Sequence, residues 1–177
     1  MDKGVSNYSL SKKQFVDWLE SYSDRIVGVN VALEHFYGPG DDPSKFATHI
    51  IQSLLSKVAS IKLTEGRQKR DFIYIDDVIR AFMTLLDNAE TLENRNRCHR
   101  FEVGTAQPVE IRKFVALAKE FSGNQKTRLD FGAIPYRKKE VMVSSVDISG
   151  LRALGWNPEV SLEDGLKRTI EIERERL

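Results

Sequence analysis

R-I-V-G-V-N-V-A-L, at residues 25–33, is a nearly continuous apolar run of strand length that is rich in β-branched side chains. Such a run favours a strand covered on both faces, as in a parallel sheet, over a strand with one face in water. Residues 6–22, just before it, fit the pattern of a helix. A helix followed by a buried strand predicts an α/β layered protein.

A loop with special backbone geometry is predicted directly after this strand, at residues 34–43, because two glycines and two prolines fall within ten residues. Asp42 is placed to cap the next helix, with Pro43 at its first position. Open α/β sheets bind their ligands at the carboxyl ends of strands. We therefore expect this loop to approach a cofactor or substrate, although a tight structural turn has the same sequence pattern.

The rest of the chain alternates predicted helices and strands. Asp76 and Asp77 are expected to cap a helix rather than to bind a metal, and Ser161 is expected to cap the last helix. Short strands are predicted at 61–64, 72–75 and 101–103, an exposed loop at 92–100 and a short helix at 147–154. The helix faces expected to be buried carry apolar residues at helical spacing: Phe46, Ile50, Ile51, Leu54, Leu55 and Val58; Ile79, Phe82, Met83 and Leu86; Ile111, Phe114, Val115, Ala118 and Phe121.

Composition excludes several classes of protein. Hydrophobic residues make up 41% of the 177 residues and the net charge is +1, which is ordinary for a globular protein and argues against nucleic acid or an anionic membrane as the main partner. The single cysteine, Cys98, excludes an internal disulfide framework. No apolar run reaches the roughly 20 residues of a membrane span. We therefore expect a cytoplasmic protein whose residues 1–177 form a single compact α/β unit.

Tyr8 and Lys12 are the first candidates for chemistry. On a helix over 6–22 they share one stripe with Phe15, Leu19 and Tyr22. An ammonium is costly to bury without a partner, and it stabilises a phenolate that lies one helical turn away. The pair therefore predicts a phenol that acts as an acid/base. The alternative is a surface helix whose lysine passes over an aromatic face.

Five segments follow one another along the chain: Y-S-L-S-K at 8–12, Y-G-P-G at 37–40, G-R-Q-K-R-D-F-I-Y-I-D-D-V at 66–78, P-Y-R at 135–137, and D-I-S at 147–149 with L-G-W-N-P at 154–158. In this order they resemble the extended short-chain dehydrogenase/reductase family, in its NAD-dependent nucleotide-sugar epimerase, dehydratase and 4-ketoreductase branch. The resemblance is predicted to concern the C-terminal half of that family only. The family's G-x-x-G-x-x-G turn and its upstream catalytic Ser/Thr are not found here.

The resemblance implies the C-terminal part of a Rossmann-like parallel sheet together with a small substrate-binding α/β region, without the N-terminal glycine-rich half. Residues 1–43 would end the dinucleotide-binding region. Residues 44–177 would form mainly the substrate-binding region, with strands returning to the sheet.

The same resemblance implies the roles of individual residues. Tyr8 and Lys12 would be catalytic, and Lys12 would also bind the cofactor, NAD or NADP, through its nicotinamide ribose. Tyr37 and Gly38 would bind the cofactor too. No metal is expected.

The substrate implied is a nucleotide-diphosphate sugar, bound by His35, Arg70 and Arg137. Arginine suits a diphosphate because its planar fork binds phosphate oxygens bidentately. The alternatives are a surface ion pair of Arg70 with Asp71 or Asp77 and a solvated basic run at 137–139. Relatives often have an asparagine at the position of His35, so its substrate contact is left open.

Two functions follow. The first is an NAD(P)-dependent epimerase/dehydratase-type enzyme acting on a nucleotide-diphosphate sugar. A 4-ketoreductase of deoxyhexose synthesis for surface polysaccharide is one form of it, because residues 131–137 resemble those enzymes. The second is a non-catalytic binding or assembly module, since an isolated chain without the glycine-rich half is expected to be inactive. A homodimer or a complementing N-terminal half is the expected protein partner, with no nucleic acid and no membrane.

Overall fold

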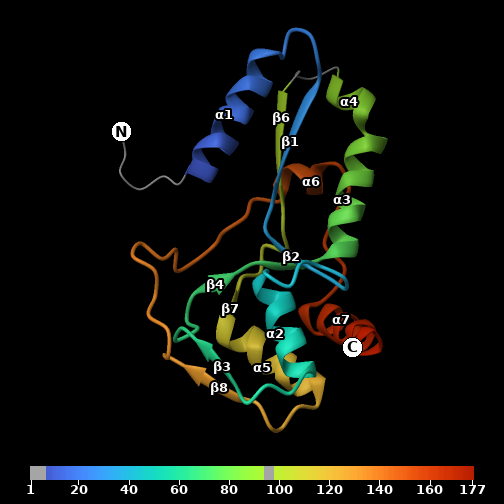
Figure 1. Cartoon of the computed structure of the whole chain (residues 1–177). Coiled ribbons are helices and arrows are strands. Elements are labelled where there is room, and N and C mark those ends of the chain that lie inside the picture. Colours follow the sequence, from blue (N-terminus) through green and yellow to red (C-terminus); the bar gives the residue numbers. More distant parts are fainter. Residues whose placement is uncertain (1–6, 94–97) are drawn as a thin grey trace.

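The computed structural model describes residues 7–93 and 98–177, and it has the α/β organisation that the sequence predicts (Figure 1). Among these residues, no helix combines the length and the apolar character that crossing a membrane requires. The elements are α1 Asn7–Ser21, β1 Gly28–Leu33, β2 His35–Tyr37, α2 Phe46–Leu55, β3 Ser60–Leu63, β4 Lys69–Arg70, β5 Phe72–Tyr74, α3 Ile75–Asp87, α4 Ala89–Glu93, β6 Cys98–Val103, β7 Val109–Glu110, α5 Ile111–Ser122, β8 Arg128–Phe131, α6 Ser149–Ala153 and α7 Leu162–Arg176.

The strands pair mainly in parallel. Strand β1 pairs with β6 from Gly28 opposite Cys98 to Leu33 opposite Val103, which confirms a parallel strand within 25–33. Strands β2 and β5, and β3 and β8, are also parallel pairs, whereas β4 and β7 are antiparallel. The prediction of a loop over all of 34–43 was wrong, because strand β2 forms there by pairing with β5.

The lower part of the molecule in Figure 1 holds a closed hydrophobic core, which we call the lower cluster. The Phe114 ring stacks on that of Phe72 with centroids 4.1 Å apart. Helix α7 approaches closely because Gly165 has no side chain; a Cβ there would collide with the hydroxyl of Tyr37. The buried residues of the lower cluster are Tyr37, Ala47, Ile50, Ile51, Leu54, Ile61, Leu63, Phe72, Tyr74, Ile111, Phe114, Val115, Ala118, Leu166 and Ile170.

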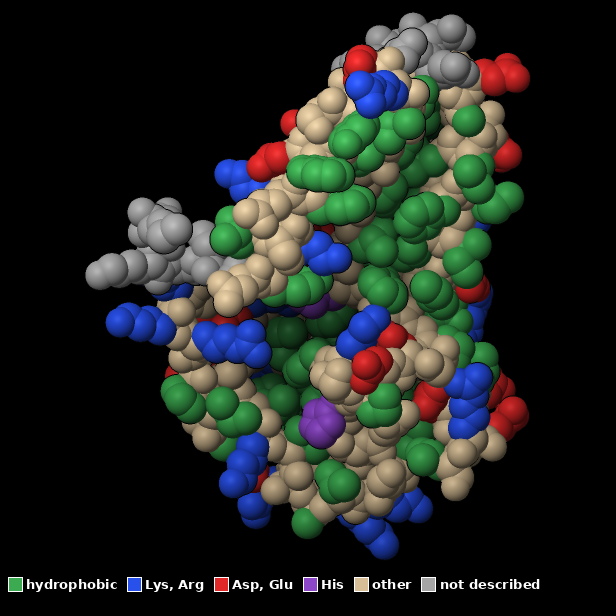
Figure 2. Space-filling model, turned by 45° about the horizontal axis from the view of Figure 1, so that its top comes forward, with side chains coloured by type: hydrophobic (Ala, Val, Ile, Leu, Met, Phe, Trp, Pro, Cys, Tyr) green, Lys and Arg blue, Asp and Glu red, His purple; other side chains and the backbone are tan. Residues whose placement is uncertain are grey.

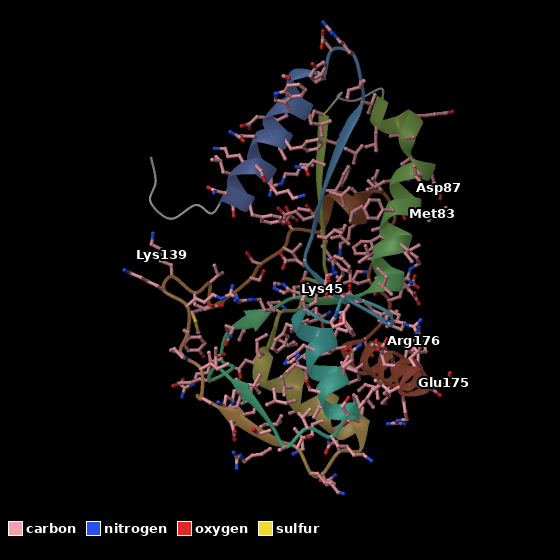
Figure 3. All side chains as sticks on the ribbon, in the orientation of Figure 1. Lys45, Met83, Asp87, Lys139, Glu175 and Arg176 are labelled. Atoms are coloured by element: carbon pink, nitrogen blue, oxygen red, sulfur yellow. The ribbon has the colours of Figure 1, made fainter. Side chains whose placement is uncertain are left out.

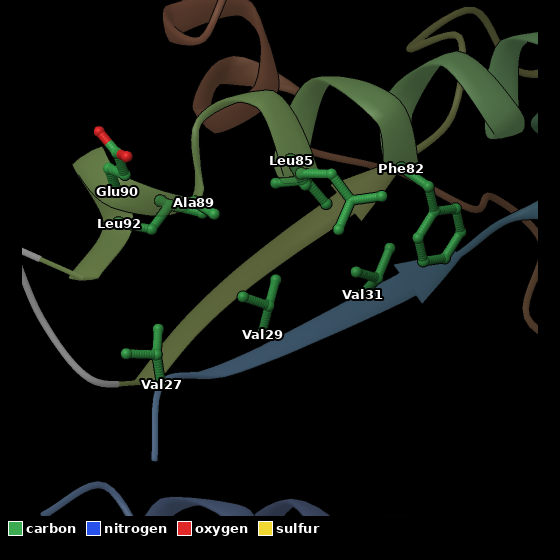
Figure 4. A pocket seen from close by; sticks show the side chains of 9 residues that line it. Val27, Val29, Val31, Phe82, Leu85, Ala89, Glu90 and Leu92 are labelled. Atoms are coloured by element: carbon green, nitrogen blue, oxygen red, sulfur yellow. The ribbon is translucent and has the colours of Figure 1, made fainter.

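The upper part holds a second core, the upper cluster, between β1, β6, α3 and α6. It leaves an open apolar groove between β1 and the end of α3 (Figure 4). The groove is lined by Val27, Val29, Val31, Phe82, Leu85, Leu86, Ala89, Glu90 and Leu92. The buried residues of the upper cluster are Ile73, Val78, Ala81, Leu85, Leu92, Phe101, Val103, Ile148, Leu151 and Trp156.

Helix α3 turns a different face inward from the one predicted. The expected residues Ile79, Phe82, Met83 and Leu86 are 42–66% exposed, so this prediction was wrong. The buried residues of the helix are Asp77, Val78, Ala81 and Leu85, because α3 packs toward β5 and α6. Two residues of its apolar stripe, Phe82 and Leu86, line the open groove.

Asp77 is fully buried and holds the C-terminal part of the chain against α3. Its carboxylate accepts hydrogen bonds from the backbone N–H groups of Glu159 and Val160, each at 3.0 Å, and pairs with Arg80. The indole of Trp156 donates to the carbonyl oxygen of Asp77. The expected capping role of Asp77 was therefore wrong, because the partners of this carboxylate lie about 80 residues away in sequence.

The starts of α2 and α7 differ in whether the expected residue caps them. Asp42 does not cap α2, which begins at Phe46 after Lys45, and instead accepts from the backbone N–H of Ser44. Ser161 does cap α7, because its hydroxyl accepts from the Asp164 backbone N–H at 3.0 Å. The capping prediction was therefore confirmed at Ser161 and wrong at Asp42.

The predicted loop at 92–100 was also wrong in part. Helix α4 extends to Glu93, and strand β6 begins at Cys98 rather than at residue 101. Residues 94–97 of the predicted loop lie outside the described residues. Pairing with β1 lengthens β6, and this pairing could not be seen from the local sequence.

Candidate functional site

Helix α1 carries Tyr8 and Lys12 on an exposed surface. None of its residues, Asn7–Ser21, is buried, and Tyr8 is 71% exposed. The ammonium of Lys12 lies 5.6 Å from the centroid of the Tyr8 ring. The expectation that this stripe points inward was therefore wrong for Tyr8, Lys12 and Phe15, which are exposed. Helix α1 packs on the rest of the described chain through Leu19, whose side chain lies against Gly28. Tyr8 and Lys12 have the geometry of a lysine over an aromatic face.

An open pocket lies where β1 ends, and it brings His35 and Arg70 together, two of the three predicted substrate-binding residues. His35 begins β2 and Arg70 ends β4, and the far wall comes from the segment after β8. Parallel strands place ligand sites at this end of a sheet. The lining residues are Leu33, Glu34, His35, Arg70, Val141 and Ser144.

The guanidinium of Arg70 is tightly paired within this pocket. One nitrogen lies 2.5 Å from the carboxylate of Glu140, and another donates to the carbonyl oxygens of Lys69 and Val141 at 2.9 and 2.6 Å. The alternative of a surface pair with Asp71 or Asp77 was therefore wrong. Asp71 is instead fully buried and accepts from the backbone N–H groups after β6.

Glu34 forms the acidic side of the pocket. Its carboxylate lies 3.3 Å from the His35 ring and accepts from the Ser144 hydroxyl at 2.8 Å. The hydrogen bond with His35 lowers the pKa of Glu34 below its ordinary value; burial opposes this, and Ser144 and Arg70 act in the same direction as His35. The pocket therefore holds an ionised carboxylate beside its arginine at neutral pH.

Tyr37 and Gly38, the predicted cofactor-binding residues, lie in the packed interior. Tyr37 is 1% exposed, and its hydroxyl donates to the carbonyl oxygen of Leu162 at 3.2 Å. Burial raises the pKa of the Tyr37 phenol well above its ordinary value. Gly38 packs against Ile75 so closely that a Cβ would collide with that side chain. The structure gives both residues packing roles, and their contact with a cofactor stays a prediction.

Arg137 lies at the start of the turn that carries Glu140, and it is exposed together with Lys138 and Lys139. Its carbonyl oxygen accepts from the Glu140 backbone N–H at 3.0 Å. Arg137 therefore lies in a solvated basic run with Lys138 and Lys139, as the alternative interpretation expected. Its binding of a diphosphate stays a prediction.

Three charged residues near the pocket were missed from the sequence: Glu34, Lys45 and Glu140. Lys45 lies 3.9 Å above the centroid of the Phe36 ring and lines a neighbouring apolar cleft that also contains His35. The position of Glu34, directly after a predicted strand, was a usable signal. Glu140 offered none, because its partner Arg70 is 70 residues away.

Known structures and sequences resemble this chain over nearly its whole length. UDP-glucose 4-epimerase from Thermotoga maritima, solved with UDP-glucose, has a TM-score of 0.83 and 27% identity and covers 97% of this chain and 54% of its own. CDP-abequose synthase from Salmonella typhimurium is 34% identical over 167 residues, 93% of this chain and 55% of the relative. The dTDP-D-glucose 4,6-dehydratase from Mus musculus is 28% identical, over 93% of this chain and 46% of the relative. The structure thus has the Rossmann-like epimerase fold, and the chain spans about half the length of these relatives.

The model of the NAD dependent epimerase/dehydratase family matches residues 2–104. The chain belongs to this family. The prediction that the resemblance concerns only the family's C-terminal half was wrong, because the family model matches the N-terminal part of this chain. The alignments with the relatives extend beyond that match, to 93% of the chain.

Proposed function

We propose that this chain binds a nucleotide-diphosphate sugar in the Arg70–His35 pocket and takes part in an epimerase, dehydratase or 4-ketoreductase reaction of its family. The observation that carries the proposal is the meeting of His35 and Arg70 at the carboxyl end of β1. The 34% identity to CDP-abequose synthase supports a sugar bound through a nucleotide diphosphate.

In this proposal Arg70 binds the diphosphate, and Arg137 enters from the neighbouring turn. A guanidinium binds two phosphate oxygens at once, which a lysine ammonium does not. His35 lies beside Arg70, with one ring nitrogen on Glu34, and the other nitrogen can hydrogen-bond a sugar hydroxyl or a phosphate oxygen. The Glu34 carboxylate would disfavour a ligand that places a further negative group beside it.

Tyr8 is the proposed acid/base, with Lys12 beside it. A phenol acts in this way by exchanging a proton with a sugar hydroxyl or carbonyl. In any preparation that converts the nucleotide sugar, Tyr8→Phe should remove the exchangeable proton. Turnover should then be abolished, while nucleotide-sugar binding persists. Turnover that survives the change would exclude Tyr8 from this role.

The described residues do not form a cradle for the phosphates of NAD or NADP. The sequence contains no G-x-x-G-x-x-G. Two of the left-handed glycines are already packed in the fold: the Gly40 N–H donates to Glu173, and Gly66 lies against Arg112. We therefore assign no hydride-transfer step to these residues, and we infer that other residues would hold the dinucleotide.

Thermal unfolding with ligands tests the proposal. Ligand at 100 times its dissociation constant stabilises the folded state by about 2.7 kcal/mol, so UDP-glucose or a CDP-sugar should raise the Tm by several degrees. NAD and NADP should give little or no shift. Arg70→Gln should remove the shift caused by the nucleotide sugar, whereas Arg67→Gln, which changes an exposed arginine paired with Glu65, should not. If neither nucleotide sugar raised the Tm, the proposed ligand class would be refuted.

A second candidate is a non-catalytic assembly module. The exposed apolar groove along β1 favours it, together with the exposed aromatic side chains of α1. Contiguous apolar surface of this kind marks protein–protein contacts, and a homodimer is the simplest assembly. Light scattering over a range of concentrations should show association that Phe82→Lys weakens. A chain that stays monomeric at every concentration would exclude this candidate.

A further inference from the structure

The turn at residues 137–140 carries Glu140 to Arg70 and contains a residue with a left-handed backbone conformation. The Glu140 N–H donates to the Arg137 carbonyl oxygen at 3.0 Å, and Lys139 has a φ of 71°. A residue other than glycine is strained in this left-handed region. Figure 3 shows the labelled Lys139 side chain pointing away from the body of the molecule. The strain must be balanced by contacts on either side of the turn.

Contacts of that kind are present on both sides. Before the turn, the Tyr136 hydroxyl accepts from the Arg67 backbone N–H at 3.2 Å. After it, the backbone of Lys69 donates to Met142 at 2.7 Å and accepts from Ser144 at 3.1 Å. Residues 136–144, which we call the strap, are therefore held at one end by Arg67 and at the other by Lys69 of β4. Between these ends the strap contacts Arg70 through Glu140 and Val141.

The Arg70–Glu140 ion pair is the inward contact of the strap. The two side chains are only 13% and 16% exposed, and their atoms are 2.5 Å apart. Three N–H bonds of Arg70 already donate, to Glu140, Lys69 and Val141. Breaking a largely buried pair leaves an uncompensated charge, which is strongly unfavourable unless another anion replaces the lost partner.

Carboxylates outnumber the guanidinium around Arg70. Glu34 and Glu140 supply two carboxylates beside one guanidinium. A phosphate entering this pocket would meet net negative charge unless one carboxylate leaves. Glu34 is tied to both His35 and Ser144, whereas among the described residues the Glu140 carboxylate bonds to Arg70 alone and follows the exposed residues 137–139. Glu140 is therefore the carboxylate that can leave.

We propose that Glu140 is a resident anion on Arg70 that a diphosphate ligand displaces as the strap moves. This inference rests on the proposed function of Arg70 in diphosphate binding. A diphosphate diester carries two negative charges against one for the carboxylate, and phosphate–arginine contacts can be bidentate. Glu140 thus weakens the binding of every anion at Arg70 and makes the pocket selective for ligands with two adjacent phosphates.

Calorimetric titration of the intact chain with pyrophosphate and with UDP-glucose tests the exchange. Glu140→Gln keeps the shape of the side chain and removes its charge, so pyrophosphate should bind about tenfold more tightly. Glu65→Gln is the matched control, because it removes the same charge from a carboxylate that pairs with Arg67 rather than with Arg70. It should change affinity less than twofold. The double variant Arg70→Gln, Glu140→Gln removes both charges of the pair and should lose binding while melting cooperatively.

The outcomes separate this inference from the proposed function. Equal pyrophosphate affinity in the chain and in Glu140→Gln would overturn the exchange, even with tight UDP-glucose binding. An equal gain in Glu65→Gln would also overturn it, because net charge alone would explain the effect. Tighter pyrophosphate binding in Glu140→Gln without any UDP-glucose binding would support the exchange and count against the proposed substrate class. Binding of neither ligand to any variant would overturn both.

Discussion

The two hydrophobic clusters of this chain differ in what covers them. The lower cluster is enclosed by α2, α5 and α7, and its central side chains, such as Phe114 and Leu166, are fully buried. The upper cluster has α3 on one side of the β1–β6 pair, and apolar side chains of β1 and α3 face an open groove. Aromatic side chains of α1, namely Tyr8, Phe15 and Trp18, are exposed as well. Figure 2 shows hydrophobic side chains gathered on the upper part of the surface. Stability should therefore reside in the lower cluster, whereas the upper surface is free for other contacts.

The largest expected effect compares two phenylalanines, one from each region. Phe114→Ala should destabilise the chain by about 3–5 kcal/mol, because it empties a site that is packed on all sides. Phe82→Ala, on the groove and 42% exposed, should cost less than about 1 kcal/mol. Urea unfolding followed by circular dichroism measures both. Similar losses would mean that the groove is covered in solution, and they would point to self-association there.

Asp77 links the two regions and should give the next largest effect. Asp77→Asn replaces a carboxylate that accepts from Glu159 and Val160 by an amide that can accept through only one oxygen. The loss of a buried, charged acceptor should cost about 2–3 kcal/mol. Asp76→Asn is the matched control, since Asp76 is half-exposed and lies 3.8 Å from Arg168; it should cost less than about 0.5 kcal/mol. Equal costs would show that the C-terminal segment does not depend on the buried carboxylate.

Glu173 gives the lower region a dependence on pH. Burial raises its pKa, but hydrogen bonds from Gly40 and Gln52 and the charge of Arg176 outweigh it, so the pKa of Glu173 lies below its ordinary value. Its contribution to stability is therefore complete above the unfolded pKa of about 4.3, and it is lost as the pH falls through the folded pKa.

Glu173→Gln should accordingly lower the unfolding free energy at pH 7, and the difference from the unchanged chain should shrink below about pH 4. Thermal melts at a series of pH values measure this difference. Glu175→Gln, an exposed change on the same helix, should show no such trend. A difference for Glu173→Gln that stays constant down to pH 3 would contradict the linkage.

The sequence was informative wherever neighbouring residues decide the structure. The apolar run at 25–33 predicted a parallel strand, and the inward face of α5 was found because Ile111, Phe114, Val115 and Ala118 recur at helical spacing. Periodicity showed that α1 and α3 each carry an apolar stripe, but it could not show whether another element covers that stripe. For Tyr8 and for Phe82 none of the described elements does so.

The candidate site was predictable only in part for the same physical reason. The family resemblance named His35 and Arg70 as substrate-binding, and the structure brings them together in one pocket; their contact with a ligand stays a prediction. The partner of Arg70 was not found, because Glu140 reaches it through a turn whose position depends on tertiary contacts with Lys69. Charge pairs that join distant segments leave no mark in local sequence patterns.

The smallest expected effect concerns the exposed helix. Tyr8→Phe should change the unfolding free energy by less than about 0.5 kcal/mol, because the Tyr8 side chain is 71% exposed. Leu19→Ala should cost more, about 1 kcal/mol, because Leu19 is the side chain through which α1 rests on Gly28. If Tyr8→Phe proved the more destabilising change, the phenol would have a buried partner, and the open upper surface would have to be closed in solution by a second polypeptide.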